Sequence, residues 1–125
     1  MRTLRGRVVT GKGNYSYWLA KLNDYYRAKT GMKLFPGTLN LQLDEEYRRP
    51  ATFLRLEKEE YGGTVSVSII PCRIFGRNAY ILRTDGAEFG GDPAEWRIIE
   101  VATDIKLRDA HKLKDGDRVE VTVDE

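Results

Sequence analysis

A short run with two glycines around a lysine follows the first apolar segment of the chain. Thr10-Gly11-Lys12-Gly13-Asn14 comes directly after Arg7-Val8-Val9, which has the composition of a strand. Glycines let the backbone approach a phosphate closely, and backbone N–H groups together with an ammonium group supply the opposing charge. The run matches neither the eight-residue P-loop pattern nor the dinucleotide-binding fingerprint. It predicts a phosphate-binding loop or, alternatively, a plain tight turn.

Two oxygen-bearing side chains follow the turn expected at Pro36-Gly37. Thr38 and Asn40 are two residues apart at the start of a segment with strand composition, so they point to the same side of that strand. A hydroxyl and an amide oxygen are hard ligands that could hold Mg²⁺, with phosphate oxygens completing the octahedron. The competing interpretation is that both are solvent-facing residues of a half-buried strand.

Glu100 is the third candidate, within the apolar run Ile98-Ile99-Glu100-Val101-Ala102. A carboxylate in so apolar a run is costly unless it faces water or a ligand. Facing a ligand, it could orient or deprotonate a substrate hydroxyl. Facing water, it would be an ordinary outer residue of the strand, and the two interpretations stay open.

The segment Asp104-Ile105-Lys106-Leu107-Arg108 places two cations at the expected start of a helix. Cations there oppose the helix dipole, at about 0.3–1 kcal/mol each when nothing offsets them. An anionic ligand at the same place would reverse the sign of that effect. The alternative is a solvated cationic face.

Segments with a two-residue apolar period carry these candidates and indicate half-buried strands. They include Leu39, Leu41 and Leu43; Leu54 and Leu56; Val65, Val67 and Ile69; and Val119, Val121 and Val123. The phase changes at Ile69-Ile70-Pro71, which predicts a β-bulge or strand bend. Frequent turn signals between short strands favour a closed or nearly closed barrel.

Two helices are expected between the strands. The first begins near Asn23 or Asp24 and stops at Gly31. The second runs for about two turns from Thr103-Asp104 to Leu113.

Length and composition describe one globular domain over residues 1–125. The net charge of +2 is too small to indicate general nucleic-acid binding. The only cysteine, Cys72, can form neither an intrachain disulfide nor a zinc site, and we expect it in the core. No stretch resembles a signal peptide or membrane span, so we expect a cytoplasmic monomer without a nucleic-acid or membrane partner.

The order and spacing of these segments resemble the archaeal-type CTP-dependent riboflavin kinases, from about Gly6 to Val123. Gly11-Lys12-Gly13, Ile99-Glu100-Val101-Ala102 and Lys106-Leu107-Arg108 contribute to the match. Its most specific parts are Gly37-Thr38-Leu39-Asn40-Leu41 and the pair of segments Leu107-Arg108 and Leu113-Lys114-Asp115-Gly116-Asp117. The resemblance implies a mainly β fold: a six-stranded cradle-loop (RIFT-like) barrel with one or two short helices. It also implies a Mg²⁺-dependent enzyme that moves the γ-phosphoryl group of CTP to riboflavin, giving FMN and CDP.

The resemblance assigns roles to individual residues. Thr38 and Asn40 would bind Mg²⁺, and Glu100 would contact the ribityl chain of the flavin and help position or deprotonate its terminal hydroxyl. The CTP phosphates would lie in the loop Gly11, Lys12, Gly13, Asn14, Tyr15 and Ser16. The rest of the nucleotide would be held, largely by backbone groups, at Ile105, Lys106, Leu107 and Arg108.

The chain departs from the family pattern in two places. Asn14-Tyr15 stands where the first loop usually has a third glycine, and Asp92 stands where a flavin-contacting threonine is usual, eight residues before Glu100. Thr84 can take that threonine's role if residues 85–93 are partly an insertion. We expect a mobile loop from Thr84 to Pro93, with Phe89 either covering the flavin ring or packed in the barrel core.

Two other functions remain open from the sequence. One is a kinase that uses another small alcohol as acceptor, because the flavin segment is altered. The other is a non-catalytic cradle-loop barrel of the DNA-binding type, although such a module would not need the pair Thr38 and Asn40.

Overall fold

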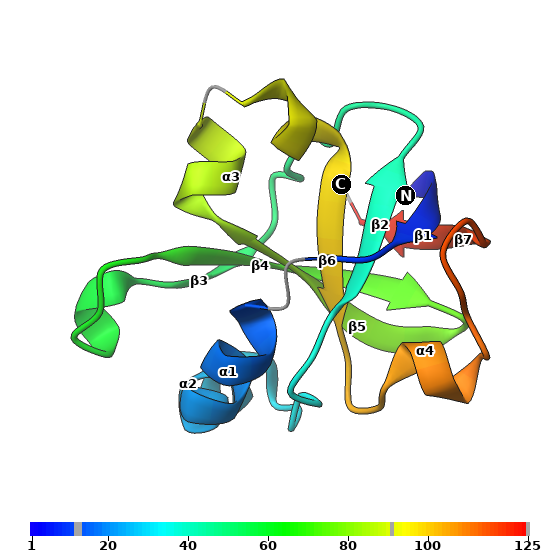
Figure 1. Ribbon diagram of the computed structural model, residues 1–125. Coiled ribbons are helices and arrows are strands. Elements are labelled where there is room, and N and C mark those ends of the chain that lie inside the picture. The colour runs from blue at the N-terminus through cyan, green and yellow to red at the C-terminus, as the bar shows by residue number, and fades with distance from the viewer. Residues whose placement is uncertain (12–13, 91, 125) are drawn as a thin grey trace.

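The segments of alternating apolar residues form one antiparallel sheet that closes on itself (Figure 1). The computed structural model describes residues 1–11, 14–90 and 92–124. Its strands are β1 (Arg2–Val9), β2 (Leu39–Leu43), β3 (Leu54–Leu56), β4 (Val67–Ile74), β5 (Arg77–Thr84), β6 (Ile98–Ala102) and β7 (Arg118–Val123). The sheet order is β3-β4-β5-β6-β2-β1-β7, and an additional pairing of β4 with β7 closes six strands into a barrel. The predicted mainly β fold and six-stranded barrel are therefore confirmed.

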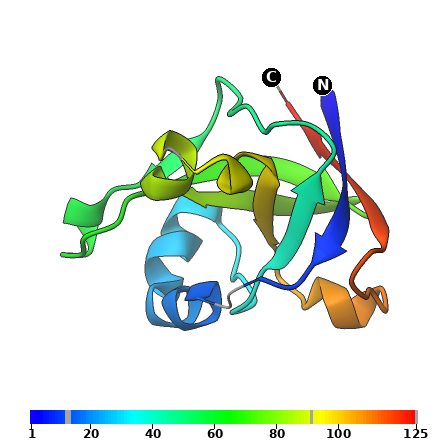
Figure 2. The same ribbon diagram turned by 45° about the horizontal axis from the view of Figure 1, so that its top comes forward.

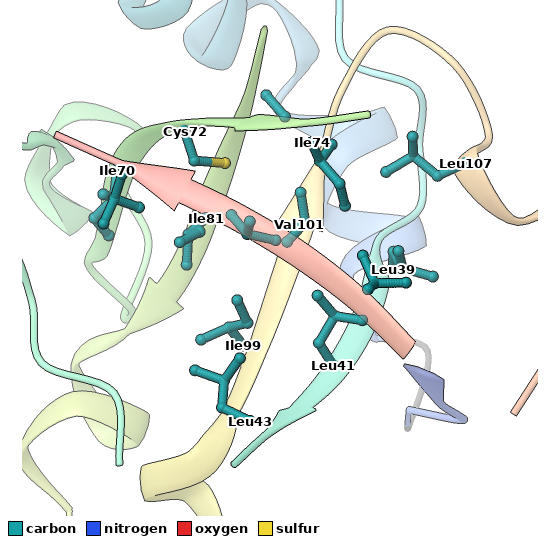
Figure 3. Packing of buried hydrophobic residues seen from close by; sticks show 14 of the residues in the cluster. Leu39, Leu41, Leu43, Ile70, Cys72, Ile74, Ile81, Ile99, Val101 and Leu107 are labelled. Carbon is teal, nitrogen blue, oxygen red and sulfur yellow. The ribbon is translucent and has the colours of Figure 1, made fainter. Parts of the chain in front are cut away.

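The barrel interior is filled by side chains from the inward-facing sides of the six barrel strands (Figure 3). On β2, Leu39, Leu41 and Leu43 are all buried while the residues between them are half-buried, as the two-residue period predicts. Cys72 also lies in this core, and burial raises the pKa of its thiol to about 12. Its predicted place in the core is confirmed.

Strand β4 has no bulge in its pairing with β5, so of the two predicted alternatives the bulge is wrong and the strand bend stays a prediction. Its register with β5 is continuous from Val67 opposite Thr84 to Ile74 opposite Arg77. The apolar pattern changes phase where β4 changes its partner strand. It pairs with β3 up to Ile69 and with β7 from Cys72 onward. Before β4 changes its partner from β3 to β7, residues on both faces of the strand are buried.

Two helices lie against the outside of the barrel (Figure 2). A second apolar cluster joins them to strands β3, β4, β5 and β6. These helices are α1 (Asn14–Lys21) and α2 (Asn23–Thr30). Helix α2 ends where predicted, with Gly31 in the left-handed conformation at φ 71°. Helix α1 was not expected from the sequence. None of the helices among the described residues is long and apolar enough to cross a membrane.

The remaining helical segments are short. They are the 3₁₀ turns η1 (Lys58–Glu60) and η2 (Pro93–Arg97) and the helices α3 (Asp85–Phe89) and α4 (Leu107–Ala110). The helix predicted from Thr103 to Leu113 is thus reduced to one turn. Lys106 has an extended backbone and Lys112 has a positive φ of 51°, which limits the helix on both sides.

Candidate active site

Two neighbouring cavities open where the end of β1, the start of α1 and the strands β2 and β6 come together. The first has a volume of about 440 Å³ and the second about 320 Å³. Both are lined by Val9, Thr10, Gly11, Tyr15 and Asn40, so the cavities share one wall. This shared wall brings together two of the segments singled out in the sequence.

The pairing of β2 with β6 builds the centre of the site. It places Asn40 opposite Glu100 in the ladder, and Thr38 Oγ1 donates a hydrogen bond to Glu100 Oε1 at 2.8 Å. Thr38 lines the first cavity, Glu100 lines the second, and Asn40 lines both. The three side chains therefore form one polar cluster at the junction of the two cavities.

Glu100 is half-buried, and its surroundings shift the pKa of its carboxyl group. Burial raises the pKa of the carboxyl above its ordinary value, and the nearby charge of Glu95 acts in the same direction. The hydrogen bond from Thr38 and the charge of Arg83 oppose the shift. A carboxylate whose proton affinity is raised is a better base toward a hydroxyl group.

Gly11 lies directly against the polar cluster. A Cβ atom at this position would overlap the carboxamide of Asn40. Glycine is therefore needed here because the backbone runs within contact distance of a site residue.

We expect Gly11→Ala to lower turnover by about 10- to 100-fold, because the Asn40 carboxamide must move and small displacements in a reacting site are costly. Gly86→Ala is a matched control, since a Cβ there would meet only Thr84 Oγ1 at 3.9 Å. Steady-state kinetics and thermal melting of both variants measure the effect. Equal activity of the two variants would show that the position of Asn40 is not critical.

The start of helix α1 borders the first cavity. Tyr15 and Ser16 lie in its first turn and line that cavity. The first N–H groups of a helix have no partner inside the helix, so they favour an anion at this end. The expected phosphate loop is thus partly helical, and its predicted residues Lys12 and Gly13 lie outside the described residues, as does the side chain of Asn14.

The segment 105–108 forms another wall of the first cavity, and its predicted role in holding a nucleotide stays a prediction. Arg108 Nη2 is bound to Asp115 Oδ1 at 2.8 Å, and Asp115 Oδ2 accepts a hydrogen bond from Thr10 Oγ1 at 2.7 Å. Asp115 therefore offsets the charge of Arg108 and ties it to the end of β1. Lys106 is exposed, with Nζ 3.7 Å from Asp109 Oδ2.

The second cavity is bounded by a short helix and not by the loop expected between Thr84 and Pro93. Thr84 caps helix α3 by accepting a hydrogen bond from the backbone N–H of Ala87, at 3.2 Å. This cap explains why a glycine-rich segment becomes helical. Thr84 and Ala87 both line the second cavity, and the flavin-binding role of Thr84 stays a prediction.

Arg83 stabilises the wall of the second cavity. The sequence alone did not indicate this role. The side chain is buried and donates hydrogen bonds to the backbone oxygens of Ala87 in α3, Glu95 in η2 and Ile98 at the start of β6. One guanidinium group thus joins three segments around the second cavity. An arginine at the end of an apolar strand gives no sequence signal for such a role.

Phe89 is not in the barrel core, because its side chain is 66% exposed. It also does not line either of the two cavities. Helix α3 turns it toward a third cavity, which it lines with Tyr47, Arg49 and Trp96, and its ring centroid is 5.4 Å from the guanidinium carbon of Arg49. The structure therefore does not place Phe89 over the cavity that contains Glu100.

The residues at the junction of the two cavities can hold a hard cation only when a phosphate ligand and water supply further oxygen atoms. Among residues 1–11, 14–90 and 92–124, no group of three or more His, Cys, Asp or Glu side chains could hold a metal ion. Thr38 and Asn40 nevertheless bring a hydroxyl and a carboxamide next to the Glu100 carboxylate. Mg²⁺ accepts such a sparse oxygen set when phosphate oxygens and water complete its octahedron.

The family model of the CTP-dependent riboflavin kinase domain, described as domain of unknown function DUF120, matches residues 8–123. The chain belongs to this family. The resemblance inferred from the motifs is thereby confirmed.

Curated relatives of this riboflavin kinase family agree with the assignment. The chain is 35% identical to the riboflavin kinase of Methanocella arvoryzae over 97% of its own length, and 37% identical to that of Archaeoglobus fulgidus over 96%. It is 36% identical to the riboflavin kinase of Ignicoccus hospitalis over 97%. The chain spans 56%, 54% and 70% of these relatives, respectively.

Proposed function

We propose that the chain transfers the γ-phosphoryl group of CTP to the terminal ribityl hydroxyl of riboflavin, giving FMN and CDP with Mg²⁺ as cofactor. The observation that carries this proposal is the shared wall of the two cavities, with the Thr38–Glu100 hydrogen bond reaching from one to the other. A transfer reaction needs donor and acceptor to meet in this way. Membership in the family supports the choice of substrates.

CTP is assigned to the first cavity. Its wall contains the first turn of α1 on one side and Ile105–Arg108 on the other. The free N–H groups of α1 and the ammonium group of Lys106 suit a triphosphate, and the sequence adds Lys12 two residues before this helix. The backbone of the segment 105–108 is the part of the wall assigned to the base.

Thr38 and Asn40 are the residues that would hold Mg²⁺. When bound, the ion neutralises charge on the phosphate oxygens. The Gly11 backbone keeps the Asn40 carboxamide at the junction, and the hydrogen bond to Glu100 orients the Thr38 hydroxyl.

Riboflavin is assigned to the second cavity, with the end of its ribityl chain at Glu100. The carboxylate accepts the proton of the terminal hydroxyl as that oxygen forms a bond to the γ-phosphorus of CTP. The bond between this phosphorus and the β,γ-bridging oxygen breaks, and CDP leaves with the electron pair. Positioning and charge neutralisation supply most of the rate acceleration in such transfers.

The pH dependence of the rate follows from the raised pKa of Glu100. Protonated Glu100 cannot accept a proton, so kcat/KM for riboflavin should fall as the pH is lowered through this pKa. Because burial raises the value, the acid limb should lie above the ordinary range of a glutamate. Rates measured from pH 4 to 8, with folding checked at each pH, test this; a limb at or below the ordinary glutamate range would contradict it.

A direct assay tests the proposed function. The protein is incubated with riboflavin, Mg²⁺ and CTP, ATP, GTP or UTP in turn, and FMN is then separated from riboflavin. We expect FMN to form fastest with CTP. No FMN with any of the four nucleotides would overturn the proposal, and equal rates with all four would overturn its CTP preference.

A further inference from the structure

Tyr15 carries a side chain that the proposed mechanism does not use. It belongs to the first turn of α1, and its ring packs against the second apolar cluster. Its hydroxyl oxygen is buried, and it has no hydrogen-bond partner within the described part of the chain. A buried polar group without a partner is costly, which makes this hydroxyl a candidate for contact with a ligand.

The position of Tyr15 relates it to both substrates. It lines the first and the second cavity, and it also lines a smaller apolar cavity of about 240 Å³ together with Trp18 and Tyr26. The charges that act on its hydroxyl include those of Glu100 and Arg83, which both line the second cavity. Glu100, the base assigned to the acceptor, is thus near enough to Tyr15 to act electrostatically on its hydroxyl.

The hydroxyl keeps its proton. Burial is the largest cause that raises the pKa of Tyr15 well above its ordinary value, and the nearby Tyr26 and Glu100 add to it. A neutral phenol is not a base at working pH. It can donate a hydrogen bond to an alcohol oxygen or accept one from an alcohol.

We propose that the Tyr15 hydroxyl hydrogen-bonds a hydroxyl of the acceptor's ribityl chain and so selects a polyol in the second cavity. This inference rests on the proposed function. The backbone N–H of the same residue lies in the helix turn assigned to the CTP phosphates, so one residue contacts donor and acceptor. Tyr15 is thus a specificity-determining residue for the acceptor.

The test compares Tyr15→Phe with Tyr17→Phe. Tyr17 lies on the same helix and is 61% exposed, so its variant controls for the loss of a tyrosine hydroxyl from α1. We expect Tyr15→Phe to raise the KM for riboflavin about 3- to 10-fold, the effect of one lost hydrogen bond, and to leave the KM for CTP unchanged. Tyr17→Phe should match the wild type in both.

Flavin binding separates a contact with the ribityl chain from a general structural effect. Lumiflavin has the flavin ring without the ribityl chain, and its fluorescence reports binding as that of riboflavin does. Tyr15→Phe should weaken riboflavin binding and leave lumiflavin binding as in the wild type, and its melting temperature should equal or exceed that of the wild type because a buried hydroxyl without a partner is removed. Equal weakening of both ligands, or an unchanged KM for riboflavin in an active protein, would overturn the inference alone. A wild type that neither binds nor phosphorylates riboflavin would overturn the proposed function, and this inference with it.

Discussion

Glu100→Gln is expected to slow phosphoryl transfer by about 10²–10⁴-fold, the range lost when a general base is removed. Gln has nearly the same shape, and its amide oxygen can still accept the hydrogen bond from Thr38 Oγ1. CTP binding should be unchanged, because Glu100 lines the second cavity and not the first. The acid limb of the pH profile should disappear with the carboxyl group.

The stability of this variant provides a control. A carboxyl whose folded pKa is raised stabilises the protein at low pH, and that contribution is lost as the pH rises through the folded pKa. The glutamine of Glu100→Gln cannot ionise, so the variant does not lose this stability at neutral pH. Its melting temperature there should equal or exceed that of the wild type. Rapid-quench rates and calorimetric CTP binding measure the other effects. A rate loss below tenfold with weaker riboflavin binding would make Glu100 a positioning residue, and unchanged kinetics would remove it from the site.

Thr38→Ala and Asn40→Ala should each reduce turnover by about 10²-fold or more, because each removes an oxygen assigned to Mg²⁺ beside the transferring phosphoryl group. Neither side chain belongs to the barrel core, so both variants should fold. Thr38→Ala should also raise the pKa of Glu100 further, since the lost hydrogen bond lowers it.

Matched variants separate the loss of a ligand from damage to β2. Thr38→Ser keeps the hydroxyl and should keep most activity. Gln42→Ala removes an amide two residues along the strand, where the side chain accepts a hydrogen bond from Arg7, and should leave turnover near the wild-type rate. The rate is measured against Mg²⁺ concentration for each variant. Near wild-type rates of Thr38→Ala and Asn40→Ala at saturating Mg²⁺ would show that the metal assignment is wrong.

The sequence predicted the strands better than the way they combine. The two-residue period of Leu39, Leu41 and Leu43 fixes which side of β2 faces the core, and therefore that Asn40 faces the other side. The ladder that puts Asn40 opposite Glu100 joins segments sixty residues apart, and no local pattern encodes it. The family resemblance predicted that Asn40 and Glu100 belong to one site, whereas the periodicity did not.

Local signals failed where the surroundings decide the conformation. The aromatic residues of α1 are weak helix formers, and the helix is stabilised by packing Leu19 into the second cluster. The glycines near α3 indicated a loop, but the cap from Thr84 and the hydrogen bonds of Arg83 to Ala87 and Glu95 hold that segment. Such long-range support is invisible in a single sequence.

We propose that donor and acceptor occupy two cavities that meet at Thr38, Asn40 and Glu100. A crystal structure with CDP and FMN bound tests this arrangement most directly. We expect CDP between α1 and the segment 105–108, the FMN phosphate beside Asn40 and Glu100, and the ribityl chain in the second cavity within hydrogen-bond distance of Tyr15. A flavin bound instead in the third cavity, against Phe89 and Trp96, would contradict it.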